Sequence, residues 1–198
     1  MIFRKRQALG MTEFEKSMQG LPHVFDNEMM KMFHHACRLT KEYNLTDEEE
    51  TEKRAGILSK LLKKAGKNLY IIPDFHCEYG NNISIGDDVL INTHCMLMDN
   101  AEISIGDHVL IGPNVSLYTV DHAIDPEERA QGICIAKPIH VENKVWICGD
   151  VQITAGVTIG EGSVIGAGSV VTKDVPPCVI AAGNPCRVIR PITDADRY

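Results

Sequence analysis

From residue 83 onward the hydrophobic pattern of the chain repeats every six residues. An aliphatic residue opens each hexad, a small residue often follows it, and a second small or branched residue stands four places later. The aliphatic positions are Ile85, Ile91, Leu97, Ile103, Ile105, Ile111, Leu117, Val141, Ile147, Ile153, Ile159, Ile165 and Val171. The small or branched positions are Val89, Cys95, Ala101, Val109, Val115, Val145, Val151, Val157, Ser163, Ser169 and Val175. This period fits neither an α-helix nor an alternating strand.

A six-residue period is typical of a parallel β-helix, in which each hexad is one short strand and a turn. Three hexads close one triangular coil, with the aliphatic side chains stacked inside and small residues at the tight corners. The frame slips by two between Ile103 and Ile105, but the hexads otherwise stay in phase. An ordinary all-β domain with glycine turns is therefore disfavoured. We predict an all-β parallel β-helix over residues 69–190, followed by a tail at 191–198.

The repeat stops at His122 and resumes near Ile139. The intervening sequence, AIDPEERAQGICIAKP, does not fit the coil. Loops of this length within a compact repeat are uncommon and tend to be functional. We predict that the loop at 123–138 covers a ligand and that the rigid coil holds His122 at its root.

The first part of the chain has a helical pattern, and we predict a small helical extension over residues 1–68. One helical face contains Met29, Met32, Phe33, Ala36, Cys37 and Tyr43, and a second stripe contains Leu58, Leu61, Leu62 and Ala65. Thr46 and Glu49 have the spacing of a capping box, and Gly66 is a stop signal. We interpret the methionine and phenylalanine stripe as core packing rather than a ligand site.

Composition excludes several classes of function. The net charge of −7 argues against non-specific binding of nucleic acid or of an anionic membrane. The seven cysteines are an odd number without a Cys-x-x-Cys pair, which favours buried thiols over a disulfide framework or a zinc site. No apolar stretch approaches the ~18 residues of a membrane span, and we expect no secretory signal because the sequence contains no apolar h-region. We expect a cytoplasmic protein.

Four segments carry a resemblance to one family: YTVDHAIDPEER, KPIHVENKVWI, GVTIGEGSVIGAGSVVTKDVPP and AAGNPCRVIR. Together with the helical extension, and in the same order, they resemble the galactoside and maltose O-acetyltransferase family of hexapeptide-repeat acyltransferases. The resemblance runs from about Met11 to Arg190. It implies a left-handed β-helix that transfers an acetyl group from acetyl-CoA to a hydroxyl of a small sugar or glycoside, without a metal. It also implies a homotrimer with active sites between subunits.

By this resemblance His122 matches the catalytic base. An imidazole that titrates near neutrality can remove the proton of a sugar hydroxyl as the hydroxyl attacks a thioester. If the sugar and acetyl-CoA bind side by side, no acyl-enzyme is needed. Asn92 matches a position that contacts the acceptor and orients the reacting groups. The remaining positions that match acceptor contacts are Asp26, Glu78, Asp99 and Trp146.

Carboxylates and amides suit sugars because they bind hydroxyl groups through hydrogen bonds. The alternative for Asp26, Glu78 and Asp99 is that they are solvated polar turn residues.

The same resemblance predicts a groove for the co-substrate. Its positions are Trp146, Gly149, Ala167, Thr172, Lys173, Arg187 and Arg190. Small residues expose backbone amides that can pair with the pantetheine arm, and the amide near Gly149 can stabilise the thioester oxyanion. The two arginines supply positive charge for the CoA phosphates, unless they belong to a solvated tail.

Three positions depart from the family pattern. Ala123 stands where the family usually has proline, and Cys148 and Asp150 stand beside the predicted groove within WICGD. The first change can loosen the loop, and the other two can crowd or recharge the path of the co-substrate.

Two alternatives belong to other classes of protein. A β-helix metalloenzyme of the carbonic-anhydrase type needs histidines at short repeat spacing. Here His94, His108 and His122 are fourteen residues apart, which does not match the roughly eighteen of a full coil. An inactive trimeric scaffold is the other alternative, and the presence of His122, Asn92 and Arg187 argues against it.

Overall fold

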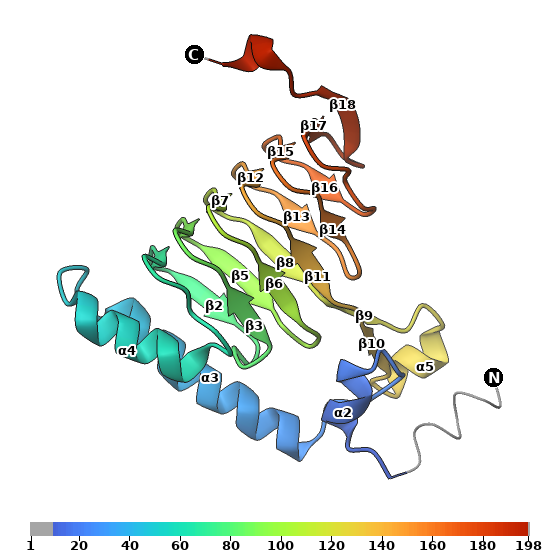
Figure 1. Ribbon diagram of the computed structural model, residues 1–198. Helices are drawn as coiled ribbons and strands as arrows, with labels where there is room; N and C mark the ends of the chain where they lie inside the picture. Colours follow the sequence, from blue (N-terminus) through green and yellow to red (C-terminus); the bar gives the residue numbers. More distant parts are fainter. Residues whose placement is uncertain (1–9, 198) are drawn as a thin grey trace.

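The computed structural model describes residues 10–197, in which three helices precede a β-helix (Figure 1). The helices are α2 (Glu13–Met18), α3 (Asn27–Leu45) and α4 (Thr51–Leu61). Helices α3 and α4 lie at the beginning of the coil, and the C-terminus lies at its far end (Figure 1). Residues 1–9 of the predicted extension and residue 198 of the predicted tail lie outside the described range. Among residues 10–197, no helix is long and apolar enough to cross a membrane.

The coil has three sides, each a sheet of short strands that pair in parallel with equivalent strands of neighbouring coils. Side 1 contains β1 (Tyr70–Ile71), β4 (Leu90–Ile91), β7 (Leu110–Ile111), β12 (Trp146–Ile147), β15 (Val164–Ile165) and β17 (Val179–Ala182). Side 2 contains β2 (Phe75–Cys77), β5 (Cys95–Met98), β8 (Ser116–Tyr118), β13 (Gln152–Ile153) and β16 (Val170–Val171). Side 3 contains β3 (Ile83–Ile85), β6 (Ile103–Ile105), β11 (Ile139–Val141) and β14 (Thr158–Ile159). The prediction of a left-handed parallel β-helix is confirmed.

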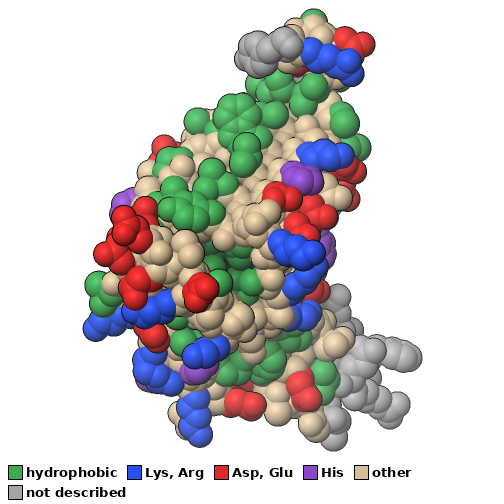
Figure 2. Space-filling view, turned by 60° about the vertical axis from the view of Figure 1, so that its left-hand side comes forward, with side chains coloured by type: hydrophobic (Ala, Val, Ile, Leu, Met, Phe, Trp, Pro, Cys, Tyr) green, Lys and Arg blue, Asp and Glu red, His purple; other side chains and the backbone are tan. Residues whose placement is uncertain are grey.

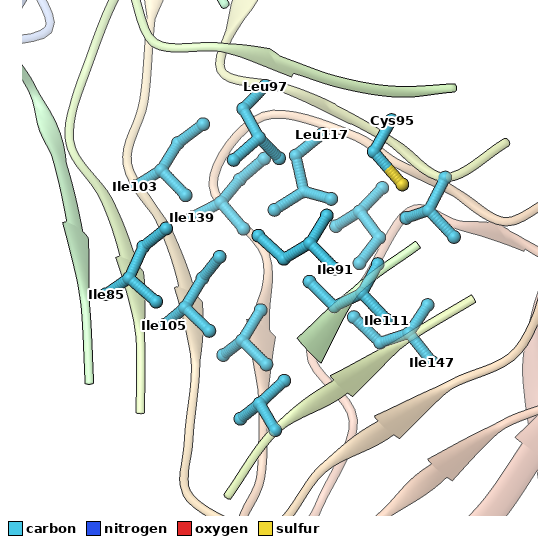
Figure 3. Packing of buried hydrophobic residues seen from close by; sticks show 14 of the residues in the cluster. Ile85, Ile91, Cys95, Leu97, Ile103, Ile105, Ile111, Leu117, Ile139 and Ile147 are labelled. Atoms are coloured by element: carbon cyan, nitrogen blue, oxygen red, sulfur yellow. The ribbon is translucent and has the colours of Figure 1, made fainter. Parts of the chain in front are cut away.

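The predicted inward residues form the core. None of the aliphatic positions of the repeat is more than 4% exposed, and they stack on one another through the coils (Figure 3). On side 1, for example, Ile111 pairs with Ile91 on one edge and with Ile147 on the other. Equivalent residues therefore meet in register along the whole coil.

The two-residue slip in the repeat also has a structural reason. Strand β6 turns both Ile103 and Ile105 into the core, with Ser104 between them facing outward. Leu90 pairs with Leu110, twenty residues later, so these early coils are longer than the later ones.

The helical extension differs from the prediction at three points. Thr46 ends α3 instead of starting the next helix, and its hydroxyl donates to the Glu42 carbonyl at 2.7 Å. The guanidinium of Arg54 donates to the Thr46 carbonyl at 3.0 Å, which uses this helix end to join α3 to α4. Cys37 is exposed although the helical face was predicted to bury it, and Ala65 is exposed because α4 has already ended.

The interruption of the repeat is an antiparallel hairpin that leaves the coil after side 2. It consists of β9 (Val120–His122), the short helix α5 (Pro126–Ala130) and β10 (Cys134–Ala136). The backbone N–H of Lys137 donates to the Thr119 carbonyl at 2.7 Å, which closes the hairpin at the coil. The N-terminal segment adds to its other edge, where His23 pairs with Cys134. At the chain end, β18 (Arg187–Pro191) pairs antiparallel with β17 and precedes the 3-10 helix η1 (Asp194–Asp196).

The stacked core gives a first testable expectation. Ile111→Ala removes a side chain that is 1% exposed and packed between two equivalent isoleucines. We expect it to lower the free energy of unfolding by about 2–5 kcal/mol, as large-to-small changes in packed cores do. Urea unfolding at a fixed protein concentration measures the loss. Ile189→Ala is the matched control, because Ile189 is 65% exposed and should change stability by less than about 0.5 kcal/mol. Equal effects of the two substitutions would contradict the stacked core.

Candidate active site

His122 ends strand β9 at the root of the hairpin and is exposed. It lines a cavity of about 550 Å³ together with residues of the hairpin and of the N-terminal segment. The other lining residues are Gly20, Pro22, Asp121, Ala123, Ile124, Asp125, Glu128, Ile133, Ile135 and Lys137. Its Nδ1 lies 3.3 Å from the sulfur of Cys134, directly opposite on β10. The histidine is therefore open to a ligand on one side and held on the other.

The N-terminal segment braces this hairpin from behind. The backbone groups of His23 and Cys134 exchange two hydrogen bonds, of 3.0 and 2.8 Å. The ring of His23 is only 4% exposed, and its Nδ1 lies 3.1 Å from the Leu21 carbonyl oxygen. Burial lowers the pKa of His23, because a charged imidazolium would lose its hydration there. A neutral His23 is thus built into the support of the His122 hairpin.

Three predicted site residues share the corner between sides 1 and 2, which we call the first corner. Asn92 follows β4, Gly149 follows β12, and Ala167 follows β15. A Cβ atom at Gly112 would lie 2.6 Å from the Gly149 nitrogen, so only glycine leaves this amide uncovered. Within the described part of the chain, the Gly149 N–H has no hydrogen-bond acceptor. The first corner therefore presents a donor suited to an oxyanion.

Two of the three departures from the family pattern, Cys148 and Asp150, also lie at this corner, whereas Ala123 lines the His122 cavity. Asp150 accepts a hydrogen bond from the side-chain amide of Asn114 on the neighbouring coil, at 3.0 Å. Its carboxylate is thereby tied to the coil. Cys148 is half-buried, and burial raises the pKa of its thiol while the N–H of Ala167 opposes this shift. The thiol therefore stays neutral beside the predicted path of the co-substrate.

The corner between sides 2 and 3, the second corner, holds Glu78 and Asp99. Asp99 is fully buried, and its carboxylate accepts the backbone N–H groups of Glu78, Tyr79 and Asn82 at 3.0, 2.7 and 3.2 Å. It shapes the turn and has no surface left for a sugar, which corrects its prediction as an acceptor contact. Glu78 is half-buried, and burial followed by the charge of Asp99 raises its pKa. Of these two carboxylates, only Glu78 remains a candidate contact.

Asp26 lies at the N-terminus of α3 and has a structural task of its own. One of its carboxylate oxygens accepts the N–H groups of Glu28 and Met29, at 3.0 and 2.9 Å, and caps the helix. After burial, the charges of Glu78, Asp99 and Asp26 raise the pKa of Tyr79. The carboxylate of Asp26 thus caps α3, and its charge also acts on Tyr79 at the second corner.

The predicted co-substrate residues are spread over the coil. Trp146 stands on the outer face of side 1 with 50% of its surface exposed. Thr172 and Lys173 are exposed after β16, and so belong to the second corner. Arg187 is exposed in β18. Arg190, in contrast, forms two hydrogen bonds with Asp196, at 2.8 and 2.7 Å, so its charge is already compensated within the chain.

Comparison with known proteins shows which family this chain resembles. Residues 16–66 match the family model described as a maltose acetyltransferase hexapeptide capping motif, and residues 138–173 match the model described as bacterial transferase hexapeptide (six repeats). The galactoside O-acetyltransferase of Escherichia coli is 44% identical over 160 residues, which are 81% of this chain and 79% of that protein.

The chain belongs to the galactoside/maltose O-acetyltransferase family of hexapeptide-repeat acyltransferases. It is an acetyltransferase.

Solved structures agree with this placement. A maltose O-acetyltransferase from Clostridium difficile superimposes with a TM-score of 0.91 at 44% identity, over 93% of this chain and 99% of that chain. A hexapeptide-repeat acetyltransferase from Vibrio cholerae, solved with acetyl coenzyme A, superimposes with a TM-score of 0.86 at 40% identity, over 93% and 100% of the two chains. The prediction of the family and of an acyltransferase is confirmed.

Sequence reasoning about this acetyltransferase missed the partners of His122. Cys134 lies twelve residues away in the chain and was grouped with the loop, although it sits opposite His122 in the hairpin. Lys137 also lines the His122 cavity. The short run CIA offered a β-propensity signal, but it gave no indication of the strand with which it pairs.

The buried His23 predicts how stability depends on pH. Because its pKa is lowered in the folded state, its contribution is full above the unfolded value of about 6.5 and is lost as the pH falls below it. We expect the melting temperature of the wild type to fall more between pH 7 and pH 5 than that of His23→Asn, whose amide can keep the bond to Leu21. Calorimetry across this range measures both. Parallel pH profiles would contradict the assignment of a neutral buried His23.

Proposed function

We propose that the enzyme transfers the acetyl group of acetyl-CoA to a hydroxyl of a small sugar or glycoside. The observation that carries this proposal is the exposed His122, held at Nδ1 and lining a cavity of about 550 Å³. The relatives named for galactosides and maltose support a sugar as acceptor. The Vibrio cholerae structure with acetyl coenzyme A supports the donor.

His122 acts as general base in a direct transfer. Its Nε2 takes the proton of the acceptor hydroxyl while the oxygen attacks the thioester carbonyl. The N–H of Gly149 donates to the oxyanion of the tetrahedral intermediate. As the C–S bond breaks, the imidazolium of His122 returns the proton to the leaving sulfur, so the products are the acetyl ester and free CoA. Positioning of both substrates supplies much of the rate, and no acyl-enzyme forms.

The proposed residues divide between two corners of one chain. Asn92 and Gly149 lie at the first corner, whereas Glu78 and the root of the His122 hairpin lie at the second. Side 2 separates the corners, and its strand β5 (Cys95–Met98) alone has four residues, roughly 13 Å. We propose that the first corner of one subunit meets the second corner of its neighbour. We propose that three copies close into a ring, which gives a homotrimer with three such sites.

The outer face of side 1 supports assembly of copies. Its outward residues form an apolar row through the paired strands: Tyr70, Leu90, Leu110, Trp146, Val164 and Ile180. Tyr70, Leu110 and Trp146 are 41%, 46% and 50% exposed. Figure 2 shows hydrophobic side chains gathered on one face of the molecule. The corresponding row on side 3 is polar, with Ser84 and Ser104. Exposed apolar patches of this kind mark interfaces.

The role of His122 is tested by its removal. The assay measures thiol release from acetyl-CoA with a panel of sugars and glycosides. With the best acceptor, we expect His122→Ala to be at least about a hundredfold slower than the wild type, because a general base contributes roughly 10²–10⁴-fold to the rate. Binding of CoA, measured by calorimetry, should be unchanged. Lys144→Ala, an exposed change on the coil, is the control. Sugar-dependent release that survives in His122→Ala would refute the base assignment.

The proposed assembly is tested by the mass in solution. Light scattering should give three times the 21.9 kDa chain mass for the wild type. Leu110→Glu places a charge in the apolar row, and we expect it to shift the trimer toward smaller species at equal concentration. Ser84→Glu, on the polar row of side 3, is the matched control. A monomeric wild type would contradict the trimer, and an intact Leu110→Glu trimer would place the interface elsewhere.

A further inference from the structure

The sulfur of Cys134 contacts the ring of His122, and the proposed mechanism gives this contact no role. The sulfur lies 3.3 Å from Nδ1 of His122 and 3.5 Å from the carbonyl oxygen of Gly132. The pairing of β9 with β10 sets Cys134 directly opposite His122. On its other edge, the backbone of Cys134 is hydrogen-bonded in both directions to the buried His23. The backbone of Cys134 is therefore held on both edges of β10, and its sulfur faces His122.

The surroundings keep this sulfur a neutral thiol. Cys134 is only 9% exposed, and burial raises its pKa. A neutral thiol is one weak donor and one weak acceptor. Its contact with Gly132 can only be a bond donated by the thiol, because a carbonyl oxygen only accepts. The sulfur lone pairs are then available to the ring of His122.

The state of His122 follows from this bond direction. In a neutral histidine whose Nδ1–H is donated to an acceptor, Nε2 carries no proton and its lone pair can accept one. Nε2 has no partner among residues 10–197, and His122 lines the cavity. A thiol that donated to Nδ1 instead would place the proton on Nε2 and block the base.

We propose that Cys134 is a positioning residue for His122. Its sulfur accepts the Nδ1–H of His122 while its S–H donates to the Gly132 carbonyl, so that Nε2 stays unprotonated and able to take the acceptor's proton. This inference rests on the proposed role of His122 as the base. The structure thus assigns to a thiol the orienting task that a carboxylate or a carbonyl performs beside many catalytic histidines.

The test compares Cys134→Ala with Cys134→Ser, because a hydroxyl can donate and accept as the thiol does. Protein labelled with ¹⁵N-histidine reports which ring nitrogen of His122 carries the proton, and His122→Gln identifies its signals. We expect a protonated Nδ1 in the wild type and in Cys134→Ser, and a shift of the proton toward Nε2 in Cys134→Ala. In the kinetic assay Cys134→Ala should lower kcat about 3- to 10-fold, which corresponds to one hydrogen bond, with KM for acetyl-CoA unchanged.

Cys186→Ala is the matched control, because Cys186 is 8% exposed and follows β17 at the far end of the coil. It should leave the His122 signals and kcat as in the wild type. A wild-type ring protonated at Nε2, an unchanged ring in Cys134→Ala, or a Cys134→Ser variant as slow as Cys134→Ala would each overturn the proposal.

The two proposals can fail separately. If His122→Ala keeps its activity, the base assignment fails, while the ring signals still decide whether Cys134 holds the Nδ1 proton. Melting temperatures of all variants separate an effect on the ring from a loss of folded protein.

Discussion

Stacking of like residues in register is the interaction on which the rest of this molecule depends. Each inward aliphatic side chain packs on its equivalent one coil away, as Ile111 does between Ile91 and Ile147. Because side chains alternate along a strand, a shift of one residue would turn the core residue outward and its polar neighbour inward. The register of the strands is therefore strongly determined, and it also fixes the positions of the residues at the corners between them. The positions of Asn92, Gly149 and Glu78 are consequences of this packing.

The hairpin obeys a different constraint. It leaves the stack, so it must obtain its rigidity from other contacts, and it does so by pairing β9 with β10 and β10 with the segment around His23. The helical extension is thus connected to the chemistry through the strand opposite His122. An exposed base on a braced hairpin combines access for a ligand with a defined ring orientation, and such pre-organisation is what positioning requires.

The coil could be predicted from the sequence because its signal is periodic and local. Thirteen aliphatic positions, Ile85 to Val171, all proved to be buried. The candidate site could be predicted only in part, because its residues are held by non-local contacts. Asp99 has the chemistry of a sugar ligand, yet three backbone amides from the preceding coil turn it into a buried turn residue. Arg190 pairs with Asp196, and Cys134 faces His122. The spacing of these residues in the sequence does not predict either contact. Thr46 similarly has the form of a helix start, but it ends α3, and its carbonyl accepts a hydrogen bond from the Arg54 guanidinium.

The central claim is that the active site is shared, with His122 from one subunit and Asn92 from its neighbour. Mixed trimers of Asn92→Ala and His122→Ala chains, produced by co-expression of two variants that are each inactive alone, test it most directly. If the site is shared, random mixing at equal amounts restores about one quarter of the wild-type sites, because only interfaces with both intact residues work. Thiol release near that level would support the shared site. Activity no higher than that of the separate variants would contradict it and place both residues in one subunit's site.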